Sequence, residues 1–123
     1  MRTVLVVDDE AQIRKMLIKF LNRNGYTAHE AEGGAQGLSL VRTLKPQVIL
    51  LDISMPGMDG IETLKRLRQE QPESTIIMIS GHADRETALQ ALDLGAHDFI
   101  EKPLDFDYLK RTLLVKMLTA DAN

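Results

Sequence analysis

The sequence predicts an α/β fold: a single doubly wound (βα)5 domain in which helices cover both faces of a parallel five-stranded sheet. Short apolar runs alternate with amphipathic stretches five times along the 123 residues. Strict alternation of this kind is typical of consecutive strand–helix units. The segments follow one another without a long linker, an internal repeat or a low-complexity stretch. We therefore expect residues 1–123 to form one domain.

The strands are predicted from five apolar runs of two kinds. Residues 3–7, 48–51 and 75–79 are continuously apolar, which favours strands buried on both faces at the centre of a parallel sheet. Residues 26–31 and 97–101 mix polar and apolar side chains and suit the edges. With right-handed crossovers, these assignments give the strand order 2-1-3-4-5.

The helices are predicted from apolar residues at helical spacing and from residues that start or stop a helix. Gly25 and Gly95 are expected to end the first and fourth helices, and Pro46 lies beyond the end of the second. Asp59 and Asp84 are expected to cap the third and fourth. The predicted inward-facing residues are Ile13, Met16, Leu17, Phe20, Leu21, Leu38, Val41, Leu44, Ile61, Leu64, Leu67, Phe106, Leu109, Leu113 and Met117.

The composition is that of a globular protein and excludes several classes of function. Hydrophobic residues make up 44% and charged residues 27% of the chain, which argues against disorder. The net charge of −3 gives no reason to expect direct nucleic-acid or membrane binding. There is no cysteine for disulfide or thiolate chemistry. The first apolar run is too short for a signal peptide, so we expect a cytoplasmic protein.

Acidic residues follow two strands that are predicted to be neighbours. Asp8 and Asp9 follow the first strand, and Asp52 follows the third. Ligands of such sheets bind at the carboxyl ends of the strands where the strand order reverses, here between the first and third. Three carboxylates in one crevice would repel one another and raise at least one pKa unless a cation lies between them. A few carboxylates with water suit Mg²⁺.

A hydroxyl and an ammonium group are predicted at the same rim. Ser80 follows the fourth apolar run, and Lys102 follows the fifth. Together with the three acids they form a site for a dianionic group beside a metal, and a phosphoryl group fits this description. Asp52 is the predicted nucleophile, because a carboxylate can form an aspartyl phosphate.

Each of these residues also has an ordinary explanation. Asp8 and Asp9 could cap the helix that follows them, and Asp52 could be a loop acid, because Asp is common after strands. Ser80 before Gly81 could be turn chemistry, and Lys102 could be a solvated surface lysine. The joint occurrence of five suitable groups at four strand ends favours the phosphoryl site.

Four motifs, "VLVVDDE", "LDISMPGMDG", "MISGHAD" and "LGAHDFIEKPLD", together resemble those of response-regulator receiver domains. The resemblance covers essentially the whole chain and implies a chemotaxis-receiver-like, flavodoxin-like fold. The last two motifs lean toward the receivers of enhancer-binding transcription activators. The resemblance implies a two-component signalling protein that is phosphorylated on Asp52 by a histidine kinase, a phosphotransfer domain or a small phosphodonor. Such a domain catalyses its own phosphorylation and autodephosphorylation and is not an ordinary enzyme.

The resemblance also implies a set of metal ligands. The expected cofactor is Mg²⁺, with Mn²⁺ as a substitute. The implied ligands are Asp8 through water, Asp9, Asp52 and the backbone carbonyl of Ser54.

The resemblance further implies a switch. Ser80 would move to bond the phosphoryl oxygen, Lys102 would pair with it, and the Lys102–Pro103 peptide bond would be cis. Ser80 stands where threonine is commoner, and Phe99 stands where tyrosine is frequent. Phe99 is interpreted either as a core residue of an edge strand or as the aromatic side chain that swings inward on phosphorylation, and both can hold.

Ser54 and His82 occupy the two family positions that tune phosphoryl lifetime, two residues beyond Asp52 and Ser80. An intermediate lifetime is expected, and His82→Glu should change the hydrolysis rate; an unchanged rate would leave His82 as a solvated loop residue. His29 and His97 show no ligand spacing and are expected to be structural or exposed.

The family resemblance assigns output to the face built from residues 84–118, which could act on a partner protein, an attached output domain or a second copy in a homodimer. No recognisable effector segment follows residue 120.

The sequence argues against three other functions. A haloacid-dehalogenase-type phosphatase needs a second Asp where Ser54 stands, and an FMN module would not place "DDEAQ" against a phosphate. A pseudo-receiver that works without phosphorylation is the remaining alternative, and it is disfavoured by the intact acid, hydroxyl and lysine set.

Overall fold

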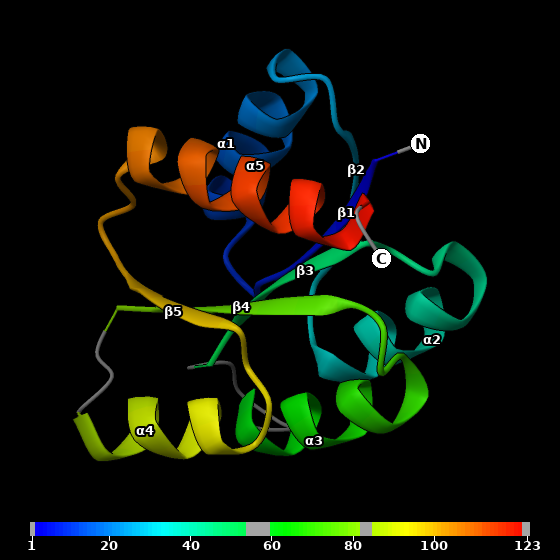
Figure 1. Ribbon diagram of the computed structural model, residues 1–123, viewed down its shortest axis with the longest axis vertical. Coiled ribbons are helices and arrows are strands. Elements are labelled where there is room, and N and C mark those ends of the chain that lie inside the picture. The colour runs from blue at the N-terminus through cyan, green and yellow to red at the C-terminus, as the bar shows by residue number, and fades with distance from the viewer. Residues whose placement is uncertain (1, 54–59, 82–84, 122–123) are drawn as a thin grey trace.

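The computed structural model describes residues 2–53, 60–81 and 85–121, with side chains up to residue 118. Strands and helices alternate along the chain, and all strand pairs are parallel in the order β2-β1-β3-β4-β5 (Figure 1). The predicted fold class and strand order are therefore confirmed. The elements are β1 (Thr3–Val7), α1 (Ala11–Arg23), β2 (Thr27–Ala31), α2 (Gly34–Leu44), β3 (Val48–Asp52), α3 (Gly60–Glu70), β4 (Thr75–Ser80), α4 (Arg85–Asp93), β5 (Asp98–Glu101) and α5 (Phe106–Asp121).

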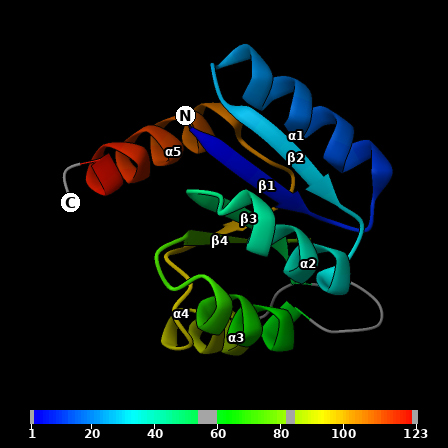
Figure 2. The same cartoon turned by 90° about the vertical axis from the view of Figure 1, so that its right-hand side faces the viewer.

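Helices cover the sheet on both faces. α1 and α5 lie on one face, and α2, α3 and α4 lie on the other (Figures 1 and 2). Successive strand residues point to opposite faces, so Leu5 and Val7 join the core under α2–α4, whereas Val4 and Val6 join the core under α1 and α5. The central strands β1, β3 and β4 are almost wholly buried, and the edge strands β2 and β5 are mixed, as their sequences predict.

Most predicted inward-facing residues are buried or half-buried, but the prediction for Met16 was wrong. Met16 is 48% exposed, whereas its neighbour Leu17 and Leu21 one turn later are fully buried. The inward-facing surface of α1 is narrower than the apolar pattern suggested: Leu17 and Leu21 belong to the core on this side of the sheet, whereas Met16 lines a surface groove with Phe20 and Phe106.

The ends of three helices agree with the sequence signals. Gly25 and Gly95 have φ of +85° and +107°, the left-handed conformation that glycine adopts without strain. α2 ends at Leu44 with Lys45 in the left-handed region and Pro46 beyond it. The expected caps Asp59 and Asp84 lie outside the described residues.

His97 has a structural role. It donates its backbone N–H to the carbonyl of Ile76 at 2.7 Å, and its ring Nδ1 accepts the backbone N–H of Ile76 at 3.1 Å. Burial lowers the pKa of His97, and the positive charges of Arg68 and Lys116 lower it further. The neutral ring therefore helps to pair the start of β5 with β4.

Candidate functional site

The carboxyl ends of four strands bring the predicted site residues to one rim of the sheet. Asp8 directly follows β1, Asp52 is the last residue of β3, Ser80 is the last residue of β4, and Lys102 follows β5. Asp8, Asp52 and Ser80 are only 1%, 3% and 0% exposed. Asp9, in contrast, is exposed. The structure thus brings these five predicted residues to adjoining strand ends.

The turn after β1 is held by hydrogen bonds that use Asp8. Its backbone N–H donates to the carbonyl of Ala31 at 3.1 Å, and its Oδ1 accepts the backbone N–H of Glu10 at 2.9 Å. The residue in the N-cap position of α1 is Glu10, with no capping bond from its side chain. The alternative that Asp8 or Asp9 serves as the cap of α1 is therefore wrong.

Lys102 connects three carboxylates. Its Nζ lies 3.3 Å from Asp8 Oδ2, 3.5 Å from Asp52 Oδ2 and 3.3 Å from Glu10 Oε1. The Lys102 backbone N–H donates to the Ser80 carbonyl at 2.7 Å, and the Lys102–Pro103 peptide bond is cis, the isomer that the resemblance implied. The lysine side chain is 15% exposed, so its charge acts in a site with little screening by water.

The carboxylates and the lysine perturb one another. Burial raises the pKa of Asp8, and the negative charge of Asp52 raises it further, while the Glu10 N–H and the Lys102 ammonium oppose the shift. Burial alone would lower the pKa of Lys102, but the charges of Asp52 and Asp8 outweigh it and raise that pKa. A single ammonium group therefore leaves an excess of negative charge at the rim.

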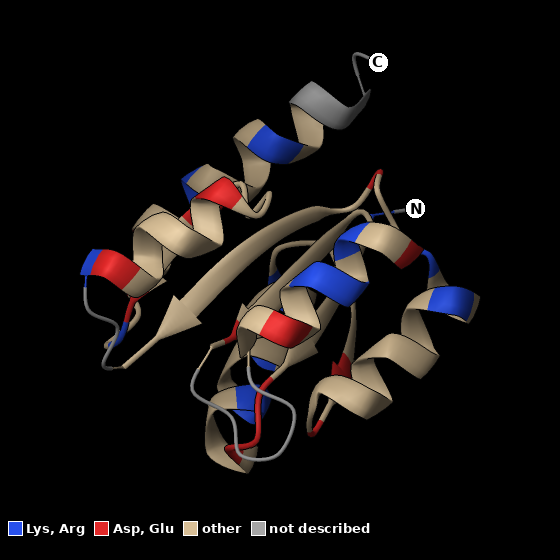
Figure 3. Ribbon diagram, turned by 90° about the horizontal axis from the view of Figure 1, so that it is seen from below, with Lys and Arg blue, Asp and Glu red and all other residues tan. Residues whose placement is uncertain are grey.

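The acids at the rim can hold a metal ion. Asp8, Asp9, Glu10 and Asp52 each offer a carboxylate oxygen, and these oxygens lie within 4.8 Å of one another. Figure 3 shows acidic residues gathered at this end of the sheet. Hard oxygen donors with surplus negative charge fit a hard divalent cation such as Mg²⁺. Sequence reasoning missed Glu10, although it is the third acid of the "DDE" run.

The remaining predicted residues fall into two groups. Phe99 is half-buried and packs against the core under α2–α4. Ser54 and His82 lie outside the described residues.

The chain returns very close to Asp52 at the start of α3. The backbone N–H of Gly60 donates to the carbonyl of Ile53 at 3.3 Å. A Cβ atom on Gly60 would lie 2.3 Å from the Ile53 Cα and 2.6 Å from its carbonyl oxygen. Glycine is therefore required here, because any side chain would displace the backbone next to Asp52.

The comparisons with known proteins agree with this geometry. Residues 4–114 match the response regulator receiver domain family. The chain is 41% identical over 106 residues to the regulatory protein AtoC of Escherichia coli, covering 86% of this chain and 23% of AtoC. It is 35% identical over 107 residues to sporulation initiation phosphotransferase F of Bacillus subtilis, covering 87% and 86% of the two chains.

A solved structure confirms the fold. A CheY-like response regulator receiver domain protein from Methanospirillum hungatei superposes with a TM-score of 0.95 at 27% identity, over 99% of this chain and 98% of that one. The chain belongs to the response regulator receiver domain family, whose members are the phosphorylation-based signal receivers of two-component systems.

Two further observations concern the length of the relatives and the search for membrane-spanning helices. The chain spans less than a quarter of the length of AtoC and of the DNA-binding transcriptional regulator NtrC of Escherichia coli, 23% and 22% respectively. Among the described residues, no helix is both long enough and apolar enough to cross a bilayer.

Gly60→Ala is expected to destabilise the fold by about 1 to 3 kcal/mol, the usual cost of forcing an extra group into a packed site. The methyl group must push the Ile53 backbone, so Mg²⁺ binding should weaken as well. Urea unfolding and Mg²⁺ titration measure the two effects. Gly33→Ala is the control, since a Cβ at Gly33 meets no atom within 4 Å. Equal stability of the two variants would contradict the inference that position 60 requires glycine.

Asp8→Asn is expected to stabilise the protein in the absence of Mg²⁺. Because the folded-state pKa of Asp8 is raised, the folded state binds this proton more tightly than the unfolded chain, and stability is lost as the pH rises through the folded-state pKa. Asparagine removes that loss near neutral pH and keeps an oxygen for the Glu10 N–H.

Thermal melting in a chelator tests the effect of Asp8→Asn. The midpoint should rise by about 4 °C for each kcal/mol gained, and the stabilisation by added Mg²⁺ should shrink. Glu73→Gln removes an exposed carboxylate and is the control. A midpoint for Asp8→Asn below that of the wild type would refute the prediction.

Proposed function

We propose that Asp52 accepts a phosphoryl group from the phosphohistidine of a histidine kinase or phosphotransfer domain, and that phosphorylation switches an output face. The observation that supports this most directly is a buried Asp52 carboxylate paired with Lys102 beside a cluster of acids. Family membership supplies the class of donor.

The chemistry that this arrangement supports is an in-line transfer. A carboxylate oxygen of Asp52 bonds to phosphorus while the bond from phosphorus to the donor's ring nitrogen breaks, and the electron pair returns to that ring. Lys102 already lies 3.5 Å from Asp52 Oδ2, so its ammonium can pair with the charged oxygens of the group that arrives. Positioning and charge neutralisation are most of what such a transfer requires.

The proposed metal ligands are the carboxylates of the acidic cluster. Asp8, through water, would hold Mg²⁺ together with Asp9, Asp52 and the backbone carbonyl of Ser54, and Mn²⁺ would be able to substitute. Glu10 is close enough to join or relay through water. The metal, when bound, would neutralise charge on the oxygens of the phosphoryl group. The fit of a metal ion to this site is supported by the short distances among the carboxylate oxygens and by the raised pKa of Asp8.

The proposed switch uses Ser80 and Phe99. Ser80 is fully buried at the end of β4, and Phe99 lies in the neighbouring strand β5. Movement of the Ser80 hydroxyl toward a phosphoryl oxygen would favour one of two packings of β5, so that phosphorylation shifts an existing equilibrium. Ser54 and His82 are proposed to tune the phosphoryl lifetime, and the hydrolysis rate of phosphorylated His82→Glu measures the part of His82.

Incubation with a small phosphodonor and Mg²⁺ is expected to give one phosphoryl adduct per chain, seen by intact mass. Asp52→Asn should give none, while the control Asp107→Asn, which changes an exposed carboxylate on α5, should behave as the wild type. An adduct that persists in Asp52→Asn would overturn the assignment. A folded wild type that neither accepts phosphoryl nor binds Mg²⁺ would support the pseudo-receiver alternative.

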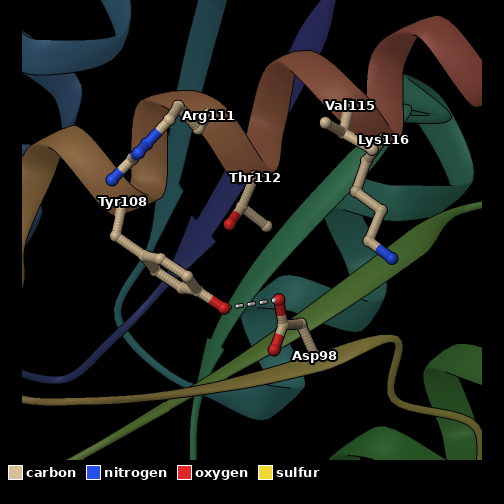
Figure 4. A pocket seen from close by; sticks show the side chains of 6 residues that line it. All are labelled: Asp98, Tyr108, Arg111, Thr112, Val115 and Lys116. Atoms are coloured by element: carbon tan, nitrogen blue, oxygen red, sulfur yellow. Dashed lines mark hydrogen bonds between the residues drawn. The ribbon is translucent and has the colours of Figure 1, made fainter.

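The output face is proposed to be α4, β5 and α5. Leu89, Leu92, Leu114, Val115 and Leu118 are all more than 40% exposed there, an apolar surface that suits a partner. A groove of about 530 Å³ lies on this face. Figure 4 shows the side chains that line it, and the Tyr108 hydroxyl donates to Asp98 Oδ2 at 3.4 Å. The groove is lined by Asp98, Tyr108, Arg111, Thr112, Val115 and Lys116. Occupants would be an output protein, an attached output domain or a second copy.

Phosphorylation is expected to increase self-association through this face if the occupant is a second copy. Val115→Glu should weaken the association, because it places a charge on a side chain that is 57% exposed on α5. Met16→Glu, which changes a side chain that is 48% exposed on α1, is the matched control. Sedimentation velocity with and without phosphodonor measures both. A phosphorylated protein that remains monomeric would leave a different partner as the occupant.

A further inference from the structure

A buried arginine lies directly behind the acidic turn and takes no part in the proposed chemistry. Arg14, in α1, is only 8% exposed. Its Nη1 donates to the backbone carbonyl of Asp8 at 2.8 Å, and its Nε donates to Glu30 Oε1 at 2.9 Å. Its Nη2 lies 3.8 Å from Glu32 Oε1. One guanidinium group therefore joins the end of β1, α1 and the end of β2.

We propose that Arg14 is a positioning residue of the phosphorylation site, which holds the turn after β1 so that its carboxylates can bind the metal. This inference rests on the proposed function of the site. Arg14 acts through the main chain of Asp8, whose carbonyl accepts the bond from its Nη1.

The position of the Asp8 carbonyl explains the effect. This carbonyl belongs to the peptide group between Asp8 and Asp9, so the bond from Arg14 fixes the plane of that peptide. The other polar atoms of Asp8 are also held: its N–H by Ala31, its Oδ1 by Glu10 and its Oδ2 by Lys102. Loss of the Arg14 bond would leave a buried carbonyl without this donor and would allow the peptide to turn, which moves Asp9.

Arginine suits this position better than lysine. The guanidinium is a rigid fork that can donate to a carbonyl and a carboxylate at the same time, whereas an ammonium is a compact point charge. Its pairing with Glu30 also matters, because a buried charge is costly unless it is paired. Glu30 neutralises the charge of the guanidinium. Arg14 can therefore bind the main chain of the turn without pairing with the rim carboxylates, which stay available to a cation.

The test compares Arg14→Met with the wild type and with Arg42→Met. Arg42 forms an exposed ion pair with Glu70 at 3.0 Å between α2 and α3, so Arg42→Met makes the same side-chain change and removes an Arg–Glu pair away from the site. The readouts are the Mg²⁺ dissociation constant by calorimetry, thermal melting, and the phosphorylation rate as a function of Mg²⁺ concentration. Removing a group that orients a metal-binding residue typically costs 10- to 100-fold in affinity, and for a bond to the main chain we expect about tenfold.

The expected result is a weaker Mg²⁺ affinity for Arg14→Met, a phosphorylation rate that recovers at high Mg²⁺, and wild-type behaviour of Arg42→Met. Arg14→Lys should fall between, because it keeps the charge and one donor. A folded Arg14→Met with the wild-type dissociation constant would overturn the proposal, even if its melting point falls. If Arg14→Met does not fold, Arg14→Lys decides, and an unchanged dissociation constant overturns the proposal. Failure of the wild type itself to phosphorylate Asp52 would refute the proposed function instead.

Discussion

The contact of Lys102 with the buried carboxylates of Asp8 and Asp52 is the interaction on which the site depends. Two acids that are almost fully shielded from water would repel each other strongly without a cation. Lys102 supplies one positive charge from the end of β5, with its nitrogen 3.3 and 3.5 Å from the two carboxylates. The rim is therefore held in a state that still attracts further positive charge.

The parallel topology of the sheet brings the residues of the site together. The carboxyl ends of parallel strands lie along one edge, so residues distant in the sequence meet without special loops. Further hydrogen bonds join these ends directly, from the Ile53 N–H to the Ile79 carbonyl and from the Lys102 N–H to the Ser80 carbonyl. The apolar residues of the same strands form the two cores, so the residues that carry chemistry occupy the positions just after the apolar runs.

The sequence was sufficient to predict the elements, their order and the residues that meet at the rim, with the exception of Glu10. Continuous apolar runs separate central strands from edge strands, and positions just after strands can be read directly from the chain. The side-chain partners could not be predicted. Nothing in the spacing of Arg14 indicates that it reaches back to the Asp8 carbonyl, and Glu10 joins the cluster because the turn folds it toward Lys102. The prediction that Met16 faces inward was wrong because helical periodicity does not give the width of the surface that a helix buries.

The shortness of β5 has a mechanical consequence. This strand has four residues, Asp98–Glu101, and at roughly 3.3 Å per residue it spans about 13 Å. Asp98 at its start lines the groove beside α5, and Lys102 follows its end. The groove and Lys102 therefore lie at the two ends of one short, partly exposed edge strand. One short edge strand is thus the direct connection between the proposed phosphorylation site and the proposed output face.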